Sequence, residues 1–276
     1  MKGLKRFMKT GLGLIGGLII ITMILVAIFA KQIAPFDPNF QNYDAILQEP
    51  GGEYLFGTDD LGRDIFSRIV YGAQISIKAA LISVGIAIII GVPIGLLSGY
   101  YRGFWDEWVV MRCVDAMKAF PFIILALAIA AVLGSGFGNA MIAIGIGFSP
   151  AFIRITRGQV LSLRNLEYVQ AAKAVGVKDL RIIFRHILPN ALSPIIIQST
   201  LAMASGILAE ASLSYLGLGV QPPTPSWGSM LNQAQTLMTV APYTTLYPGI
   251  AIFIVVLGFN LLGDGLQQYL DPRIKN

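Results

Sequence analysis

The sequence has little of what a soluble enzyme or a disulfide-bonded domain requires. Only 13% of its 276 residues are charged, and it contains one histidine, His186, and one cysteine, Cys113. An ordinary soluble domain is about a quarter charged, so this chain cannot cover its surface for water. One cysteine cannot form an intrachain disulfide, and one histidine without partner ligands is weak support for a metal site. We therefore expect no catalytic residue and no metal ligand.

The sequence also has no Gly-x-x-x-x-Gly-Lys-Ser/Thr motif, the loop that cradles the phosphates of ATP. We therefore expect no cofactor bound by this chain. Its net charge of +5 would suit nucleic acid if Lys and Arg were gathered on one exposed face of a soluble domain. They lie between hydrophobic runs instead, so we expect no nucleic-acid partner.

Long apolar runs are what the sequence does have. Hydrophobic residues make up 55% of the chain, and they gather into six runs long enough to cross about 30 Å of hydrocarbon as helix, or nearly so. The runs are 11–30, 79–97, 108–133, 140–155, 194–213 and 247–262. They predict an all-α polytopic membrane protein with six transmembrane helices, surrounded by membrane lipid. The first run is too long for a usual signal peptide and is interpreted as an uncleaved span.

The positions of Lys and Arg predict the orientation, because these residues resist translocation and accumulate on the cytoplasmic side. If the N-terminus is cytoplasmic, only Lys31, Arg63, Arg68 and Lys78 lie outside. The last external stretch, residues 214–246, has no Lys or Arg at all. The chain is therefore expected in the inner (cytoplasmic) membrane, with both termini cytoplasmic.

Two external loops are candidates for contact with a partner. In the first, residues 34–57 are rich in Pro, Gly and Asn, whereas apolar residues recur at helical spacing from Asp60 onward. This pattern predicts an amphipathic helix on the outer membrane surface, with Thr58 as its N-cap. The second loop is stiffened by prolines. The residues we expect to face an external partner are Asp59, Asp60, Arg63, Asp64, Pro222, Pro223 and Trp227.

The stretch 164–189, RNLEYVQAAKAVGVKDLRIIFRHILP, lies on the predicted cytoplasmic side. A simple hairpin between spans needs only a few residues, so this length requires another reason. Residues 167–175 predict a short helix that ends at Gly176. Residues 178–187 predict a second helix, with Leu180, Ile183, Phe184 and Ile187 on one stripe. Together they predict a rigid projection.

Within this stretch, Gln170, Ala171, Ala172 and then Gly176 resemble the Glu-Ala-Ala-x-x-x-Gly loop of permease subunits in ATP-binding-cassette importers. Gln170 departs from the usual Glu, which puts an ion pair at that position in doubt but keeps length and hydrogen bonding. The resemblance implies an ATPase-coupling role. The residues concerned are Glu167, Tyr168, Gln170, Ala171, Ala172, Lys173, Gly176, Asp179 and Pro189.

Four further strings resemble the dipeptide, oligopeptide and nickel permease family, specifically its C-type membrane subunit. They are FGTDDLGRDIFSR (56–68), RGQVLSLRNLEYV (157–169), LSYLGLGVQPPTPSWG (213–228) and FNLLGDGLQQYLDPR (259–273). The resemblance implies a type I importer permease fold: residues 1–75 as a first span with its external loop, 76–266 as a five-helix permease core, and 267–276 as a cytoplasmic tail.

The resemblance also implies partners: a homologous B-type permease, two cytoplasmic ATPases that bind ATP and Mg, and an external solute-binding protein. This chain would then be no enzyme, and its cargo would be di- or oligopeptides or related small solutes. A nickel or nickel-chelate permease is the alternative. An ion-coupled secondary transporter fits less well, since it would place acids at mid-span. A membrane scaffold without a transport role is a third class.

Two acids in or beside the apolar runs are candidates for the transport pathway or a subunit interface. Glu210 lies within the fifth run, and Asp264 falls just past the sixth. An ionisable group in hydrocarbon costs a few kcal/mol, so it normally faces a bundle interior or an aqueous cavity. Glu210 could contact a solute amine or a partner permease, or form a structural hydrogen bond near the outer interface.

Overall fold

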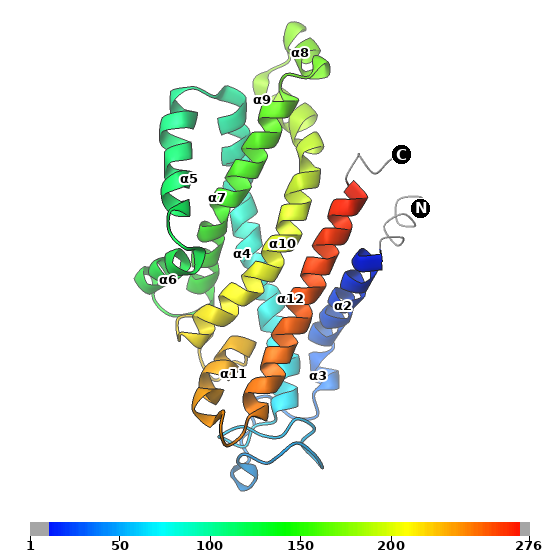
Figure 1. Cartoon of the computed structure of the whole chain (residues 1–276), viewed down its shortest axis with the longest axis vertical. Coiled ribbons are helices and arrows are strands. Elements are labelled where there is room, and N and C mark those ends of the chain that lie inside the picture. Colours follow the sequence, from blue (N-terminus) through cyan, green and yellow to red (C-terminus); the bar gives the residue numbers. More distant parts are fainter. Residues whose placement is uncertain (1–10, 271–276) are drawn as a thin grey trace.

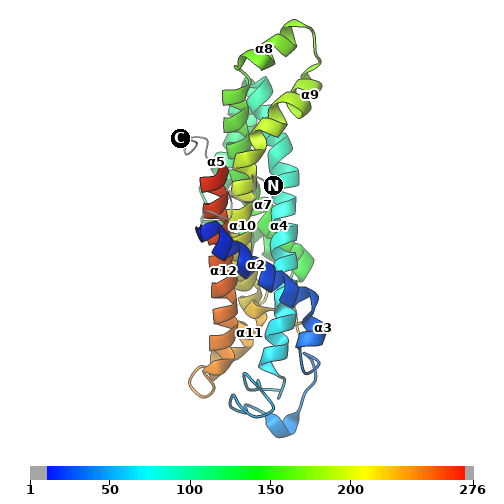
Figure 2. The same cartoon turned by 90° about the vertical axis from the view of Figure 1, so that its right-hand side faces the viewer.

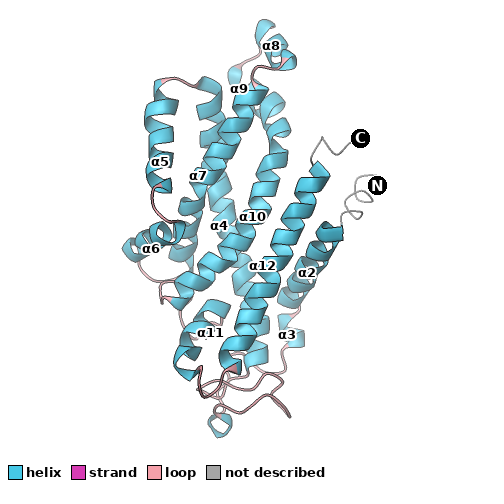
Figure 3. Ribbon diagram, viewed as in Figure 1, coloured by secondary structure: helices cyan, strands magenta, loops and turns pink. Residues whose placement is uncertain are grey.

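The computed structural model describes residues 11–270, and all its helices and loops are drawn in Figure 3. No strand forms within these residues; two isolated bridges, Gly51 with Tyr54 and Thr58 with Asp64, lie in a loop. Within residues 11–270, five helical segments are long and apolar enough to cross a membrane. They are α2 (Gly11–Ile28), α4 (Ile65–Tyr101), α7 (Phe137–Leu163), Asp179–Tyr215, which ends in α10 (Leu188–Tyr215), and α12 (Tyr243–Leu270).

The third predicted span is broken. A π-helical segment, η2 (Trp105–Val110), continues into α5 (Met111–Lys118), and α6 (Phe122–Leu133) follows after a bend of 100°. Pro121 explains the break, because a proline disfavours helical geometry in the residue before it. Counted as one span, the bent pair completes the six predicted from the sequence.

The most extensive helix contact in the bundle is between α4 and α7. Gly91, Gly95 and Gly99 follow each other every four residues and so lie along one face of α4. A Cβ atom added at Gly95 would lie 2.7 Å from the Ile153 carbonyl oxygen, and one at Gly99 would lie 2.8 Å from the Val160 Cβ. The absence of side chains there allows the two backbones to approach closely.

Shorter elements lie at opposite ends of the bundle (Figure 1). At one end are α8 (Glu167–Ala174), α9 (Asp179–Ile182) and the π-helical η3 (Ile183–Ile187), which joins α10 directly. We call residues 164–189 the projection. At the other end are α3 (Ala30–Ile33), η1 (Tyr43–Ala45), α11 (Trp227–Ala234) and η4 (Gln235–Leu237). Residues 34–64, which we call the long loop, lie there too, and Figure 2 shows the same separation.

The prediction of a separate surface helix from Asp60 onward is wrong. Helix α4 begins only at Ile65 and runs without interruption into the span, and its N-cap is Asp64, whose side chain accepts from the Ser67 N–H. Gly62 explains the difference, since its φ of +69° is incompatible with a right-handed helix. Thr58 is buried in the long loop, where its hydroxyl donates to the Ala45 carbonyl.

Several predicted features lie outside the described residues. These are Lys2, Lys5, Arg6 and Lys9 at the N-terminus, and Arg273 and Lys275 at the C-terminus. Of the predicted tail, 267–276, the residues up to Leu270 continue helix α12.

Candidate functional site

The projection is built as the sequence predicts. Helix α8 turns Val169 and Ala172 inward, while the rest of its side chains are exposed. Gly176 ends it with a φ of +79°. The Gly176 N–H donates to the Lys173 carbonyl and the Val177 N–H to the Ala172 carbonyl, a helix C-cap that requires the left-handed conformation glycine adopts readily. The reversal that follows brings α9 back toward the bundle.

The base of the projection is fixed to the end of α4. Tyr100 is central: its hydroxyl donates to the Asp179 carboxylate at 2.6 Å, and the Lys173 ammonium lies 4.8 Å from the centre of its ring. The Arg164 guanidinium donates to the Tyr100 carbonyl at 2.8 Å and to the Gly99 carbonyl at 3.3 Å. Asp179 and Lys173, both predicted coupling residues, therefore hold the projection against α4.

The other predicted coupling residues divide between local contacts and open surface. The Gln170 amide donates to the Arg164 carbonyl at 3.0 Å, a bond that the glutamate usual at this position could not donate. The Tyr168 hydroxyl donates to the His186 carbonyl at 3.4 Å and accepts from the Asn190 amide at 3.3 Å. Glu167 and Ala171 are exposed, and Pro189 lies in the first turn of α10.

The projection has an exposed apolar surface that was not predicted from the sequence. Val175 is 79% exposed, Leu180 58% and Phe184 56%, while Ile183 and Ile187 are buried. The predicted stripe is thus split between core and surface. Ile182, Ile183 and Ile187 form the buried face of this segment, and the predicted stripe lies across the edge of that face. An apolar stripe in the sequence suggests a core-facing side and gives no sign of such a division.

A buried ion pair near the projection was also missed. Arg157 of α7 forms two parallel bonds to the Asp106 carboxylate, at 2.7 and 2.6 Å. Ser98 of α4 donates its hydroxyl to the same carboxylate. Paired guanidinium and carboxylate planes fix orientation as well as distance, so this contact ties η2 to both α4 and α7 just below the projection.

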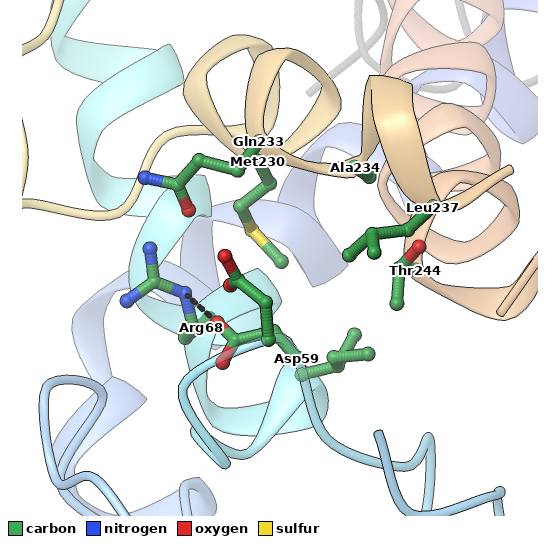
Figure 4. Close-up of a pocket in the computed structure, with 9 residues that line it drawn as sticks. Asp59, Arg68, Met230, Gln233, Ala234, Leu237 and Thr244 are labelled. Atoms are coloured by element: carbon green, nitrogen blue, oxygen red, sulfur yellow. Dashed lines mark ion pairs between the residues drawn. The ribbon is translucent and has the colours of Figure 1, made fainter. Parts of the chain in front are cut away.

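Several of the residues predicted to face an external partner form contacts within the chain instead. Asp59, Arg63 and Asp64 are buried, and the Asp59 carboxylate lies 2.7 Å from the Arg63 Nε and 3.6 Å from the Arg68 Nε. Arg63 also donates to the Gln233 side chain of α11 at 3.0 Å. Figure 4 shows Asp59 and Arg68 facing each other beside Gln233 and Met230. We call Asp59, Arg63, Arg68 and Gln233 the buried charge network.

The four remaining residues predicted to face an external partner differ in their exposure. Trp227 is buried against α4, where its indole N–H donates to the Ile69 carbonyl at 3.0 Å, so it does not present a surface to a partner. Pro222 and Pro223 are exposed, as is Asp60, which lies 3.7 Å from Arg63. Contact of these three with a partner stays a prediction.

Glu210 is fully enclosed by its own chain. Its two carboxylate oxygens accept from the hydroxyls of Ser76 on α4, at 3.2 Å, and Ser214, at 2.7 Å. The alternative of a structural hydrogen bond is thus favoured over contact with a solute. Asp264 is exposed near the end of α12. Among residues 11–270, no group of three or more His, Cys, Asp or Glu side chains could hold a metal ion.

The comparisons with known proteins agree with this architecture. Residues 91–276 match the family model described as binding-protein-dependent transport system inner membrane component, and residues 2–50 match the N-terminal TM domain of oligopeptide transport permease C. A methionine ABC transporter, MetNI, in inward-facing conformations has the same fold with a TM-score of 0.62, over 74% of this chain and 97% of that one, at 19% identity.

Relatives with similar sequences span nearly the whole chain. The glutathione transport system permease protein GsiD of Escherichia coli O157:H7 is 48% identical over 98% of this chain and 89% of its own length. GsiD of Pectobacterium atrosepticum is 44% identical over 99% and 90%. The dipeptide transport system permease protein DppC of Alkalihalophilus pseudofirmus is 48% identical over 99% and 89%. This chain therefore belongs to the family of binding-protein-dependent transport system inner membrane components, as a multi-pass permease of the inner membrane.

Proposed function

We propose that this chain is the C-type permease subunit of an ATP-driven importer of dipeptides, oligopeptides or glutathione. The names of its relatives support this class of solute, since GsiD and DppC permeases are each similar over nearly the whole chain. A homologous B-type permease and an external solute-binding protein would complete the transport route. Both termini of this chain would lie in the cytoplasm.

The observation that carries the proposal is the projection. It extends beyond the bundle, presents apolar side chains at its surface and is fixed at its base to Tyr100 of α4. Exposed apolar side chains on a rigid element are suited to contact with another protein. Two separate ATPase subunits, which carry ATP and Mg, would grip the projections of the two permeases. A movement there would reach α4 through the contacts of Tyr100 with Asp179 and Lys173.

The test is Gly176→Val in the complete importer. Val is strained at a φ of +79°, so the end of α8 should be displaced. We expect ATP-driven uptake of a labelled dipeptide or of glutathione to fall about tenfold, the size of a typical coupling free energy. ATP hydrolysis stimulated by the loaded binding protein should fall with it.

The matched control is Gly103→Val. Gly103 has a φ of +83° and, like Gly176, open space around the added side chain, but it lies in the turn after α4 and outside the projection. Membrane insertion should be normal for both variants and uptake normal for Gly103→Val. Normal uptake and normal stimulated hydrolysis in Gly176→Val would overturn the coupling role.

A further inference from the structure

Charged side chains are exposed on one face of the bundle, along a segment that belongs to a span. Arg112, Asp115 and Lys118 follow at intervals of three residues on α5 and are all exposed, and Arg154 of α7 lies beside them. A charge in hydrocarbon costs about 3 kcal/mol or more. This face is therefore covered by water or protein rather than by lipid.

Three of these four charges already have contacts within the chain. Asp115 and Arg154 form an ion pair of 2.6 Å, and the Arg112 guanidinium lies 5.2 Å from the centre of the Trp108 ring. The pair of Asp115 and Arg154 joins α5 to α7. Lys118 forms no ion pair with any residue between 11 and 270, so its ammonium is available to a ligand.

Lys118 lies at the break in the third predicted span. It is the last residue of α5, and the span bends by 100° between Lys118 and Phe122. In secondary transporters, interrupted spans of this kind form solute sites.

A cavity of about 470 Å³ opens at this bend. Lys118 and Phe122 line it from the bent span, Phe148 from α7, and Gln198 and Ser205 from α10. Phe122 and Phe148 stack with their ring centres 4.5 Å apart. Gln198 and Ser205, seven residues apart, lie on the same face of α10. The volume is within the range of small-molecule sites, and the lining has their usual composition, apolar walls with a few polar groups.

Resting on the proposed function, we propose that this cavity lies on the solute route and that the Lys118 ammonium binds the carboxylate of the passing peptide. Every unmodified peptide has a C-terminal carboxylate, which the Lys118 ammonium can bind as a partly exposed ion pair. The aromatic walls would accept apolar side chains of varied size. The Gln198 amide and the Ser205 hydroxyl can bind peptide groups.

The first experiment measures whether position 118 faces water and solute. In the Cys113→Ser background, which removes the natural thiol, Lys118→Cys is introduced into the assembled importer. A charged methanethiosulfonate reagent modifies thiolates, which form in water and not in lipid. We expect rapid modification that slows severalfold when loaded binding protein and ATP drive turnover with a dipeptide. No modification, or modification unaffected by turnover, would overturn the proposal.

The second experiment measures the role of charge. Uptake of a dipeptide with neutral side chains is compared with uptake of its C-terminal amide, each at saturating loaded binding protein. The preference for the acid is the ratio of dipeptide uptake to uptake of the amide. In Lys118→Met we expect this ratio to fall about fivefold, which corresponds to the free energy of one partly exposed ion pair. Lys118→Arg should retain the preference.

The control is Lys78→Met, which removes an exposed lysine from α4 beside α2, away from the cavity. Its preference for the acid should match that of the natural protein. An unchanged preference in Lys118→Met would overturn the role of the lysine while leaving the proposed function intact. Failure of the natural complex to take up either peptide would instead contradict the proposed function.

Discussion

The long loop and the projection are both long polar connections between spans, but they differ in where their charged side chains lie. The long loop turns charges inward: Asp59 and Arg63 are buried together with Arg68 of α4, and Arg63 reaches Gln233 of α11. Most charged side chains of the projection are exposed, beside the exposed apolar side chains of Val175, Leu180 and Phe184. The long loop also exposes apolar side chains, at Phe40, Tyr43, Ile46 and Leu55, so buried charge is what distinguishes it from the projection.

The difference separates residues that hold the chain together from residues that can meet a partner. A buried charge that loses its counter-charge destabilises the fold strongly. An exposed apolar side chain contributes little to the stability of its own chain, so its loss should affect association instead. Substitutions in the two regions should therefore change different measurements.

The largest effect is expected for Asp59→Asn. This change leaves the guanidiniums of Arg63 and Arg68, which are 3% and 1% exposed, without their shared counter-charge. We expect the free energy of unfolding to fall by about 3 kcal/mol, seen as a lower thermal midpoint of the purified protein in detergent. An unchanged midpoint would show that the buried charge network does not stabilise the long loop.

A smaller effect, on coupling alone, is expected for Leu180→Asp. Leu180 is 58% exposed on the projection, so the thermal midpoint should not change. If an ATPase covers this surface, stimulated hydrolysis should fall about tenfold, the loss expected for an apolar interface anchor. The matched control is Val240→Asp, a similarly exposed apolar residue at the opposite end of the bundle. Equal losses in both variants would show that the effect is not specific to the projection.

The smallest effect is expected for Asp60→Asn. The Asp60 side chain is 45% exposed and lies 3.7 Å from Arg63, and exposed ion pairs contribute about 0–1 kcal/mol. The thermal midpoint should shift little, whereas that of Asp59→Asn should fall clearly. If Asp60 contacts the external binding protein, the variant should raise the concentration of loaded binding protein needed for half-maximal uptake, and an unchanged value would exclude this contact.

The projection could be predicted in detail because its signals are local. The length of the stretch, the helix-favouring residues and Gly176 as a helix end all act within a few residues of one another. The long loop was predicted less well for the same reason. Apolar spacing after Asp60 indicated a helix, but Gly62 adopts a positive φ and is packed against the Asn42 backbone, a contact across twenty residues that no local pattern reveals.

Composition and hydrophobic run length by themselves determined that the chain is a bundle of six membrane-spanning segments, since the bilayer requires about twenty apolar residues per span. Only the tertiary structure decided which charges meet. Asp59 pairs with Arg68, Asp106 with Arg157 and Asp115 with Arg154, while Lys118 is left facing a cavity. Sequence spacing limits which side chains share a helix face, but pairing between helices depends on how the helices pack.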